Sequence, residues 1–494
     1  MKRILLASVL FCLIAAFSNA QEPPAAERDF RAAWIATVDN VDFPSKKALS
    51  IEDQKKELIR DLDIAKELKM NAVIFQVRPM CDAVYRSNIE PWSEFLTGEM
   101  GKGQDFDPLE FIVAEAHKRG ILVHAWFNPY RAYHPAAKTV SENHISKRRP
   151  ELVKKYGKYL WLDPGEKEVQ DYSLSVVLDV VKRYDIDGVH FDDYFYPYPE
   201  QDAEKKKIDF PDDASWNKYL IKNEMRDAYK GAHTTPLSRE DWRRKNVDDF
   251  IAAVGRGIKE IKPDVMYGIS PFGIWQPVPE KNIRGLNAYT ELYADARKWL
   301  QEGTVDYIVP QLYWETARNG QSYPVLLDWW DAQNTQKRHV WPGLATYKIG
   351  STPTYTAGEI VDEIKRTRGP RTSAGAVHFS FKWLRSDLGG IRDALRKNVY
   401  QKDAVIPASP WKGAKRPEAP GVKIERNKNY VRASWVERGP RKAFWFVVYA
   451  KDKDGWTWSV LPAAEKGISL TADRKIEKIV VTSVDRLGNE SASR

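Results

Sequence analysis

The sequence predicts an α/β protein: a (β/α)8 TIM barrel followed by a small C-terminal β-sandwich. Three observations predict this class. Short apolar runs recur eight times along the chain, and amphipathic segments with helical spacing separate them. From about Ala419 the pattern changes to short stretches in which apolar and polar residues alternate.

The eight apolar runs have the composition of parallel strands that are buried on both faces. They cover residues 31–38, 71–79, 121–130, 188–196, 265–275, 306–314, 339–350 and 375–384. Segments 51–70 and 108–120 between them are amphipathic, and Gly120 is placed to end the second helix. Eight strand–helix units over residues 28–402 favour a barrel. A doubly wound open sheet is the alternative, but no glycine-rich phosphate fingerprint follows the first run.

The first 20 residues are typical of a secretory signal peptide. Lys2 and Arg3 precede the apolar run 4–17, and the small residues Ser18 and Ala20 mark a cleavage site. We therefore expect an exported protein, periplasmic or extracellular, whose mature chain has no transmembrane segment. Cys81 is then the only cysteine of the mature chain, which excludes an internal disulfide.

A basic module is expected at the C-terminus. Residues 403–418, rich in Pro, Lys and Ala, are the predicted linker, and residues 419–494 resemble a fibronectin type III β-sandwich in "VRASW", "VVYAKD" and "VTSVDRLGNES". From Trp411 onward there are 18 Lys and Arg but 10 Asp and Glu, which accounts for +8 of the formal net charge of +9. We expect this module to contact an anionic cell-envelope surface. A basic spacer that only packs on the barrel is the alternative, and no nucleic-acid partner is expected.

Polar and aromatic side chains gather where the predicted strands end, which is the face that carries active sites in such barrels. In the fourth run His190, Asp192 and Tyr194 share one face, and Asp193 points the other way unless the strand has already ended. The candidates at the ends of the other runs are Arg78, Asn128, Tyr130, Arg131, Trp275, Gln311, Tyr313, Trp314, Tyr347, Lys382 and Trp383.

This combination of residue types indicates a sugar-binding site. Flat aromatic rings stack on pyranose rings, while amides, arginine and carboxylates hydrogen-bond to hydroxyl groups. Asp192 is the expected principal catalytic carboxylate, as nucleophile or as the group that orients a substrate acetamido group, and Asp193 or Glu315 is the second. A structural network is one alternative, in which the aspartates cap a helix or pair with Arg78 or Arg131.

A metal site is a further alternative, with His124 and His190 converging on the same aspartates. Hydrolytic metal sites usually contain more histidines, so we expect neither a metal nor another cofactor.

Several segments together resemble the glycosyl-hydrolase-like family ten, formerly a domain of unknown function. They are "RAAWIATVDNVDFPS", "VIFQVRPMCDAVYRSNIEPWSEFLTG", "HAWFNPYRA", "DGVHFDDYFYPYP", "ISPFGIW" and "VPQLYW". The resemblance covers about residues 28–400. It implies a TIM-barrel glycosidase-type enzyme of bacterial envelopes that hydrolyses peptidoglycan strands lacking stem peptides. A fainter similarity links "DGVHFDDYFYP" to chitinase-like barrels, but Tyr194 stands here where those have a glutamate acid.

The expected function is hydrolysis of a β-linked, N-acetylated glycan. One alternative is a non-catalytic carbohydrate-binding protein on the same scaffold. Another is a hydrolase of a dietary or plant polysaccharide.

Overall fold

The computed structural model describes residues 22–230, 235–369, 371, 374–471, 473 and 475–493, without the side chains of 226–230. The predicted signal peptide, residues 1–20, lies outside these residues. None of the described helices is long and apolar enough to cross a membrane.

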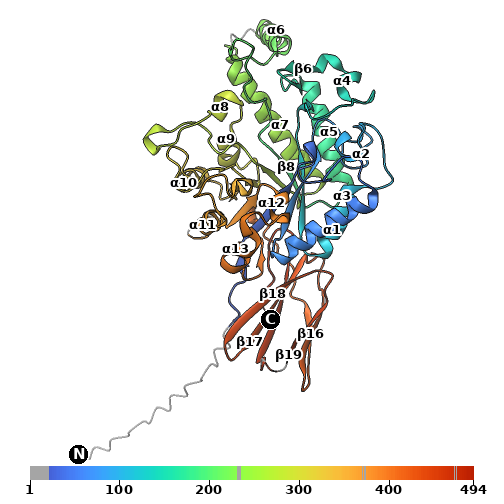
Figure 1. Cartoon of the computed structure of the whole chain (residues 1–494), viewed down its shortest axis with the longest axis vertical. Coiled ribbons are helices and arrows are strands. Elements are labelled where there is room, and N and C mark those ends of the chain that lie inside the picture. Colours follow the sequence, from blue (N-terminus) through green and yellow to red (C-terminus); the bar gives the residue numbers. More distant parts are fainter. Residues whose placement is uncertain are drawn as a thin grey trace, which may run out of the picture.

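Most of the chain folds around a nine-stranded parallel sheet with the order β11-β10-β9-β8-β4-β3-β2-β13-β12 (Figure 1). Its two edge strands belong to one stretch of chain and are separated only by Trp341 and Pro342, so the sheet curls round until its edges meet in that stretch. Each of the eight predicted runs overlaps a strand. The strands are β2 (Phe30–Ile35), β3 (Ala72–Arg78), β4 (Leu122–Phe127), β8 (Gly188–Phe191), β9 (Met266–Ile269), β10 (Tyr307–Ile308), β11 (His339–Val340), β12 (Gly343–Leu344) and β13 (Gly375–His378).

Helices cover the outside of this sheet (Figure 1). The predicted helical segments 51–70 and 108–120 are confirmed as α1 (Ile51–Glu67) and α3 (Pro108–Lys118). Helix α1 begins after Ser50, whose hydroxyl accepts from the amide of Asp53, and α7 (Arg239–Ile261) begins in the same way after Ser238. The outer helices are α1 (Ile51–Glu67), α3 (Pro108–Lys118), α5 (Lys167–Arg183), α7 (Arg239–Ile261), α9 (Ala296–Gln301), α10 (Tyr323–Gln333), α11 (Ala357–Thr367) and α13 (Ile391–Asn398). Short helices are α2 (Glu94–Thr97), α4 (Ile145–Arg148), α8 (Ala288–Glu291) and α12 (Phe381–Arg385).

Alternate residues of each strand belong to two different cores. On β2, Ala33 and Ile35 pack outward into the large cluster beneath the helices, whereas Ala32 and Trp34 join a second cluster enclosed by the sheet. On β4, Val123 and Ala125 likewise point outward. Because side chains alternate along a strand, every second residue points into the space enclosed by the sheet. This holds up to the carboxyl ends of the strands.

Two insertions extend the carboxyl ends. After β4 come β5 (Arg131–Tyr133), β6 (Val153–Tyr156) and β7 (Tyr159–Leu162), which form a three-stranded antiparallel sheet, and after β8 comes α6 (Asp213–Lys230). Both insertions lie at the end of the molecule opposite the C-terminal region (Figure 1).

The C-terminal region forms two three-stranded antiparallel sheets below the opposite end of the large sheet (Figure 1). One contains β15 (Gly421–Arg426), β16 (Tyr430–Val436) and β19 (Gly467–Thr471), and the other β17 (Trp445–Asp452), β18 (Gly455–Pro462) and β20 (Lys478–Val484). Trp435 and Phe446, one from each sheet, share a hydrophobic cluster. Trp445 donates to the carbonyl of Gly120 at 2.8 Å, which ties the region to the larger part. The fibronectin type III assignment stays a prediction.

The segment predicted as a linker begins with a strand. β14 (Ala404–Val405) pairs with β1 (Glu27–Arg28), which precedes β2. The start of this segment is therefore part of the base of the larger unit.

Candidate active site

A cavity of about 280 Å³ lies at the carboxyl ends of the parallel strands. Strands β2, β3 and β4 and the loops that follow the other strands, including β8, contribute to its walls. It is lined by Trp34, Ala36, Val38, Val41, Gln76, Trp126, Arg131, His134, Asp192, Asp193, Tyr194, Tyr198, Ser270, Gln311, Tyr313, Tyr347 and Phe379. Both predicted aspartates, an arginine, an amide and several aromatic rings therefore share one cavity.

Asp192 directly follows β8 and is 4% exposed. Its carboxyl group accepts hydrogen bonds from Nε1 of Trp126 at 3.1 Å and from Nδ2 of Asn128 at 3.3 Å. Burial raises the pKa of Asp192 from 3.8 to about 7, and the neighbouring Asp193 adds to this rise while Arg131 opposes it. A carboxyl group with this pKa exchanges its proton near neutral pH.

Asp193 lies in the same cavity because β8 ends at Phe191. Continued strand alternation would have sent its side chain to the opposite face. The hydroxyl of Tyr198 donates to Asp193, and Gln311 is a second hydrogen-bond partner. Burial raises the pKa of Asp193, although these hydrogen bonds work in the opposite direction. Across the described chain, neither aspartate forms an ion pair, so two adjacent buried carboxyl groups lack a paired cation.

Arg131 is the arginine that lines the cavity together with these carboxyl groups. Its Nε and Nη2 donate to the carbonyl of Pro79 at 3.0 and 2.9 Å, and its guanidinium lies 5.2 Å from the ring centre of Tyr194. These contacts fix the guanidinium at the cavity wall without neutralising either aspartate. Asn128 is held in the same loop, because its Oδ1 accepts from the amide of Arg131 at 2.8 Å.

Aromatic rings form much of the remaining wall. Trp34 meets Phe379 edge-on at 5.8 Å between ring centres, and Tyr313 meets Tyr347 in the same way at 6.0 Å. Tyr347 is 38% exposed and therefore available to solvent molecules. This arrangement offers flat apolar faces beside hydrogen-bonding groups, as a sugar ring requires.

Several predicted site residues lie outside the cavity lining. Arg78 is fully engaged elsewhere: its Nε donates to both carboxylate oxygens of Glu90 at 2.8 and 3.0 Å, and its Nη1 donates to the carbonyls of Asn128 and Pro129. Tyr130 is buried against Phe250, 5.2 Å away between ring centres. Both residues stabilise the strand ends from the outer core.

His190 lies inside the curl, beneath the aspartates. Its Nε2 accepts from Nε1 of Trp34 at 3.1 Å, and its Nδ1 contacts the hydroxyl of Tyr307 at 3.1 Å. Burial lowers the pKa of His190 well below its usual value, so the ring is neutral. His124 contacts the same Tyr307 hydroxyl at 2.7 Å, and the residues that the structure describes contain no group of three or more His, Cys, Asp or Glu suited to a metal ion.

The other predicted residues make local contacts. Trp275 donates to Asp295 at 2.9 Å, and Trp314 packs edge-on against Phe272. Lys382 lies over the ring of Trp383 at 5.2 Å. Glu315 accepts from the hydroxyl of Thr352 at 2.5 Å and that of Thr354 at 2.9 Å.

Other lining residues were not predicted. Trp34, Gln76 and Trp126 occupy inward positions on β2, β3 and β4, and the alternation that singled out Asp192 could have found them. His134 and Tyr198 come from the insertions, where no periodic pattern marks a side chain as part of a site.

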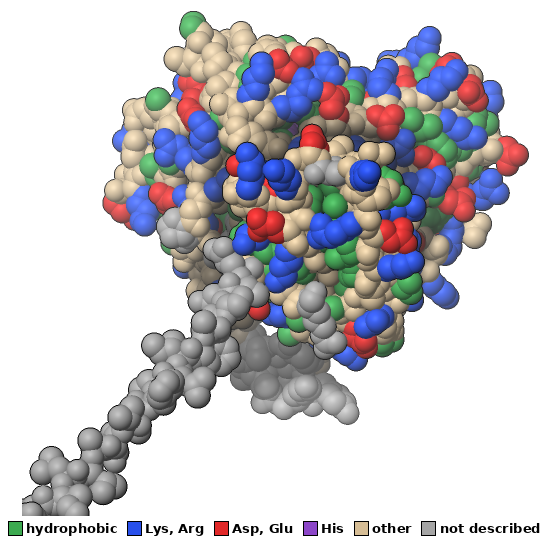
Figure 2. All heavy atoms as spheres, turned by 90° about the horizontal axis from the view of Figure 1, so that it is seen from below, with side chains coloured by type: hydrophobic (Ala, Val, Ile, Leu, Met, Phe, Trp, Pro, Cys, Tyr) green, Lys and Arg blue, Asp and Glu red, His purple; other side chains and the backbone are tan. Residues whose placement is uncertain are grey.

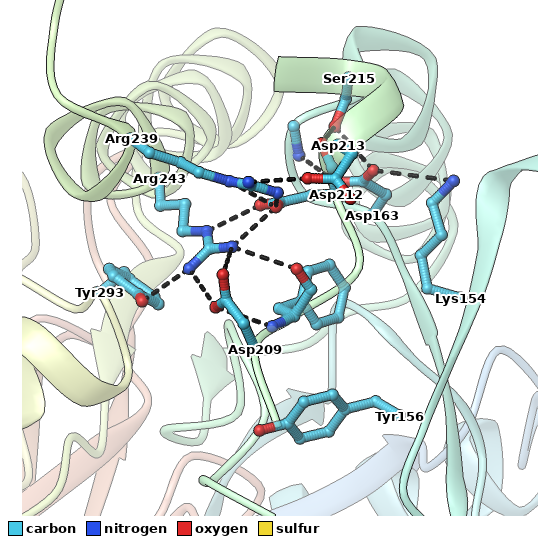
Figure 3. A network of polar contacts seen from close by, with 12 residues as sticks. Lys154, Tyr156, Asp163, Asp209, Asp212, Asp213, Ser215, Arg239, Arg243 and Tyr293 are labelled. Atoms are coloured by element: carbon cyan, nitrogen blue, oxygen red, sulfur yellow. Dashed lines mark hydrogen bonds and ion pairs between the residues drawn. The ribbon is translucent and has the colours of Figure 1, made fainter. Parts of the chain in front are cut away.

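A polar network holds the second insertion in place beside the first (Figure 3). Arg243 of α7 donates to Asp212 at 2.7 Å and to Asp209 at 2.8 Å. Ser215 of α6 donates to Asp163, which follows β7, at 2.8 Å. The network therefore connects both insertions to α7 at the carboxyl ends of the strands.

Comparison with known protein families identifies the family to which this chain belongs. Residues 29–358 match the family described as Glycosyl hydrolase-like 10. The chain belongs to this family. The resemblance stated from the sequence motifs is thereby confirmed over these residues.

Two relatives named as glycosyl hydrolases match most of the chain. The chain is 38% identical to "Glycosyl hydrolase YngK" of Bacillus subtilis (strain 168), over 96% of its length and 93% of the relative. It is also 38% identical to "Glycosyl hydrolase DigH" of Escherichia coli (strain K12), over 67% of this chain and 76% of that one. The catalytic domain of a beta-amylase from Paenibacillus polymyxa shares the fold alone, with 12% identity and a TM-score of 0.50 over 76% of this chain and 99% of that chain. The family match and the two glycosyl hydrolase relatives support a glycan-acting enzyme.

Proposed function

We propose that the protein is an exported glycoside hydrolase with a (β/α)8 barrel that cleaves a β-linked, N-acetylated glycan, such as peptidoglycan strands lacking stem peptides. The observation that carries the proposal is the pair of adjacent, buried and unpaired aspartates, Asp192 and Asp193, in a cavity with aromatic walls. Membership of the glycosyl hydrolase-like family supports it.

The placement of the two aspartates favours a mechanism that the substrate assists. Direct displacement needs carboxyl groups that flank the scissile bond, whereas consecutive residues at the end of one strand approach the sugar from one side. An acetamido oxygen of the substrate can instead attack the anomeric carbon. Asp192 would accept the acetamido N–H and stabilise the positive charge that develops, while Asp193 would donate a proton to the leaving oxygen.

The surroundings of each aspartate suit these roles. The raised pKa of Asp192 makes its carboxylate a strong acceptor for the acetamido N–H, and Trp126 and Asn128 hold it in one orientation. The raised pKa of Asp193 lets it keep the proton that an acid must donate. Gln311 and Tyr198 hold the Asp193 carboxyl group.

Digestion of purified glycans tests the proposal. The panel contains peptidoglycan strands with and without stem peptides, chitin, and a plant polysaccharide, and the products are separated and weighed by mass spectrometry. We expect cleavage of the strands without stem peptides, and none after their chemical de-N-acetylation. Binding without cleavage across the panel would point to a carbohydrate-binding protein instead, and cleavage of the plant polysaccharide alone would identify another substrate class.

A further inference from the structure

A second cavity lies at the opposite ends of the strands, near the start of β11 and the segment that leads to the C-terminal sheets. Its volume is about 330 Å³. Arg256 and Lys259 of α7 line one side, and Arg338, which directly precedes β11, lines another together with Trp411. The proposed catalytic mechanism uses none of these residues.

Arg338 packs against Trp411 and Gly303, and its guanidinium has no hydrogen-bond acceptor among the residues that the structure describes. Its guanidinium lies 4.7 Å from the ring centre of Trp411. It also packs closely on Gly303, because a Cβ atom added to that glycine would lie only 2.7 Å from Nη2 of Arg338. Its Nε is buried without a partner. Within the described part of the chain, the guanidinium forms neither an ion pair nor a hydrogen bond. Because Arg338 lines the cavity, an acceptor bound there could hydrogen-bond to this unpaired guanidinium and stabilise the arrangement.

The carboxylate in this cavity serves other donors. Asp306 accepts from Nε1 of Trp411 at 2.8 Å, from Nζ of Lys412 at 2.9 Å and from the amide of Tyr267 at 2.8 Å. Burial lowers the pKa of Arg338, and Asp306 only partly opposes this effect. Arg256 and Lys259 also have no carboxylate partner among the described residues. Three cations therefore line one cavity without matching anions.

We infer that this cavity binds a phosphate group. A guanidinium presents a planar pair of donors that matches two phosphate oxygens, and Arg256 and Lys259 add positive charge that attracts the anionic group. Basic and acidic side chains are interspersed over the face that includes the C-terminal region (Figure 2), but from Trp411 onward 18 Lys and Arg outnumber 10 Asp and Glu, which favours the approach of anions. A lipid headgroup and free phosphate share this chemistry.

Binding measurements on the full chain test the inference. Calorimetry with inorganic phosphate and sedimentation with vesicles of phosphatidylglycerol, or of phosphatidylcholine as the neutral reference, identify the source. We expect Arg338→Gln to weaken phosphate or phosphatidylglycerol binding about tenfold, with glycan hydrolysis unchanged. The matched control is Arg366→Gln, an exposed arginine at the end of α11, which should bind like the wild type.

A second variant guards against a folding defect. Arg256→Gln combined with Lys259→Gln alters two exposed side chains and should also weaken binding. Binding of phosphate but not of vesicles would identify a soluble ligand, and binding of phosphatidylglycerol vesicles alone would identify a headgroup. The inference is overturned if the wild type binds neither probe, or if both variants bind as tightly as the wild type.

Discussion

Two clusters of buried polar side chains lie at the carboxyl ends of β3 and β8, which flank β4 in the sheet, and they differ in how their carboxyl groups are neutralised. At the end of β3, Arg78 pairs with Glu90, and its other hydrogen bonds go to two backbone carbonyls and to the sulfur of Cys81. After β8, Asp192 and Asp193 accept hydrogen bonds but have no cation partner in the described structure. The first cluster is neutralised internally, whereas the second keeps the unpaired carboxyl groups that we propose exchange protons with a substrate.

The difference separates structural from functional polar residues at one face. A closed ion pair holds loops together, and breaking it exposes an uncompensated charge. Carboxyl groups kept unpaired in a buried cavity reduce stability and persist where chemistry requires them. Substitutions in the two clusters should therefore affect different properties.

Asp192→Asn should have the largest effect and should act on catalysis. The amide keeps the shape of the side chain but cannot stabilise the developing positive charge, so we expect turnover to fall about 10³- to 10⁵-fold. The rate is measured on a glycan that the wild type cleaves, and circular dichroism verifies the fold. A variant within tenfold of the wild type would remove Asp192 from the catalytic role.

Glu90→Gln should act on stability instead. It leaves the guanidinium of Arg78 buried without its carboxylate, which should lower the free energy of unfolding by about 3–5 kcal/mol. Urea unfolding measures the change, and turnover of the folded fraction should stay near the wild-type value. Glu151→Gln removes an exposed partner of Arg149 and is the control, with little change expected. An unchanged unfolding midpoint for Glu90→Gln would mean that the Arg78–Glu90 pair does not hold the loops.

The pH dependence of stability should separate the wild type from Asp192→Asn. The folded protein keeps the Asp192 proton up to about pH 7, whereas the unfolded chain loses it near 3.8, so this contribution to stability is full below 3.8 and is lost as the pH rises through 7. Relative to the wild type, the variant should gain about 2–4 kcal/mol between pH 3.5 and 8. Unfolding curves at both pH values measure the gain, and a difference independent of pH would show that Asp192 titrates normally.

The sequence predicted the strands well because burial on both faces leaves a strong apolar pattern. It also located Asp192, Gln311 and Tyr313, which follow strands and face inward. It misplaced Arg78 and Tyr130 relative to the cavity, because a residue at a strand end can turn to either side once alternation stops.

Other parts of the site depend on information that no local pattern carries. Asp193 enters the cavity only because β8 ends at Phe191. Tyr198 contacts Asp193 because the insertion after β8 folds so that this residue lines the cavity. The partner of Arg78, Glu90, lies in a loop 12 residues further along the chain, and nothing in its neighbourhood predicts the pairing.

Tyr198→Phe should have a moderate effect on the proposed acid. The lost hydroxyl no longer orients Asp193, so we expect kcat to fall about tenfold with little change in KM. The hydrogen bond lowers the pKa of Asp193, so its loss should raise that pKa and shift the alkaline limb of the pH–rate profile upward. A fall in kcat without this shift would indicate that Tyr198 acts on the substrate or the fold rather than through Asp193.

Glu315→Gln should have the smallest effect. Glu315 shares the end of the sixth run with Gln311 and Tyr313, and this shared face made it a candidate for the second carboxyl group. In the structure its carboxylate faces Thr352 and Thr354, whose hydroxyl groups lower its pKa, so it remains ionised and is a poor proton donor. We expect turnover within about twofold of the wild type, since surface changes away from a site cost little. If turnover on the cleaved glycan fell a hundredfold while the fold was kept, Glu315 rather than Asp193 would be the acid, and the active site would extend to the loop that contains Thr352.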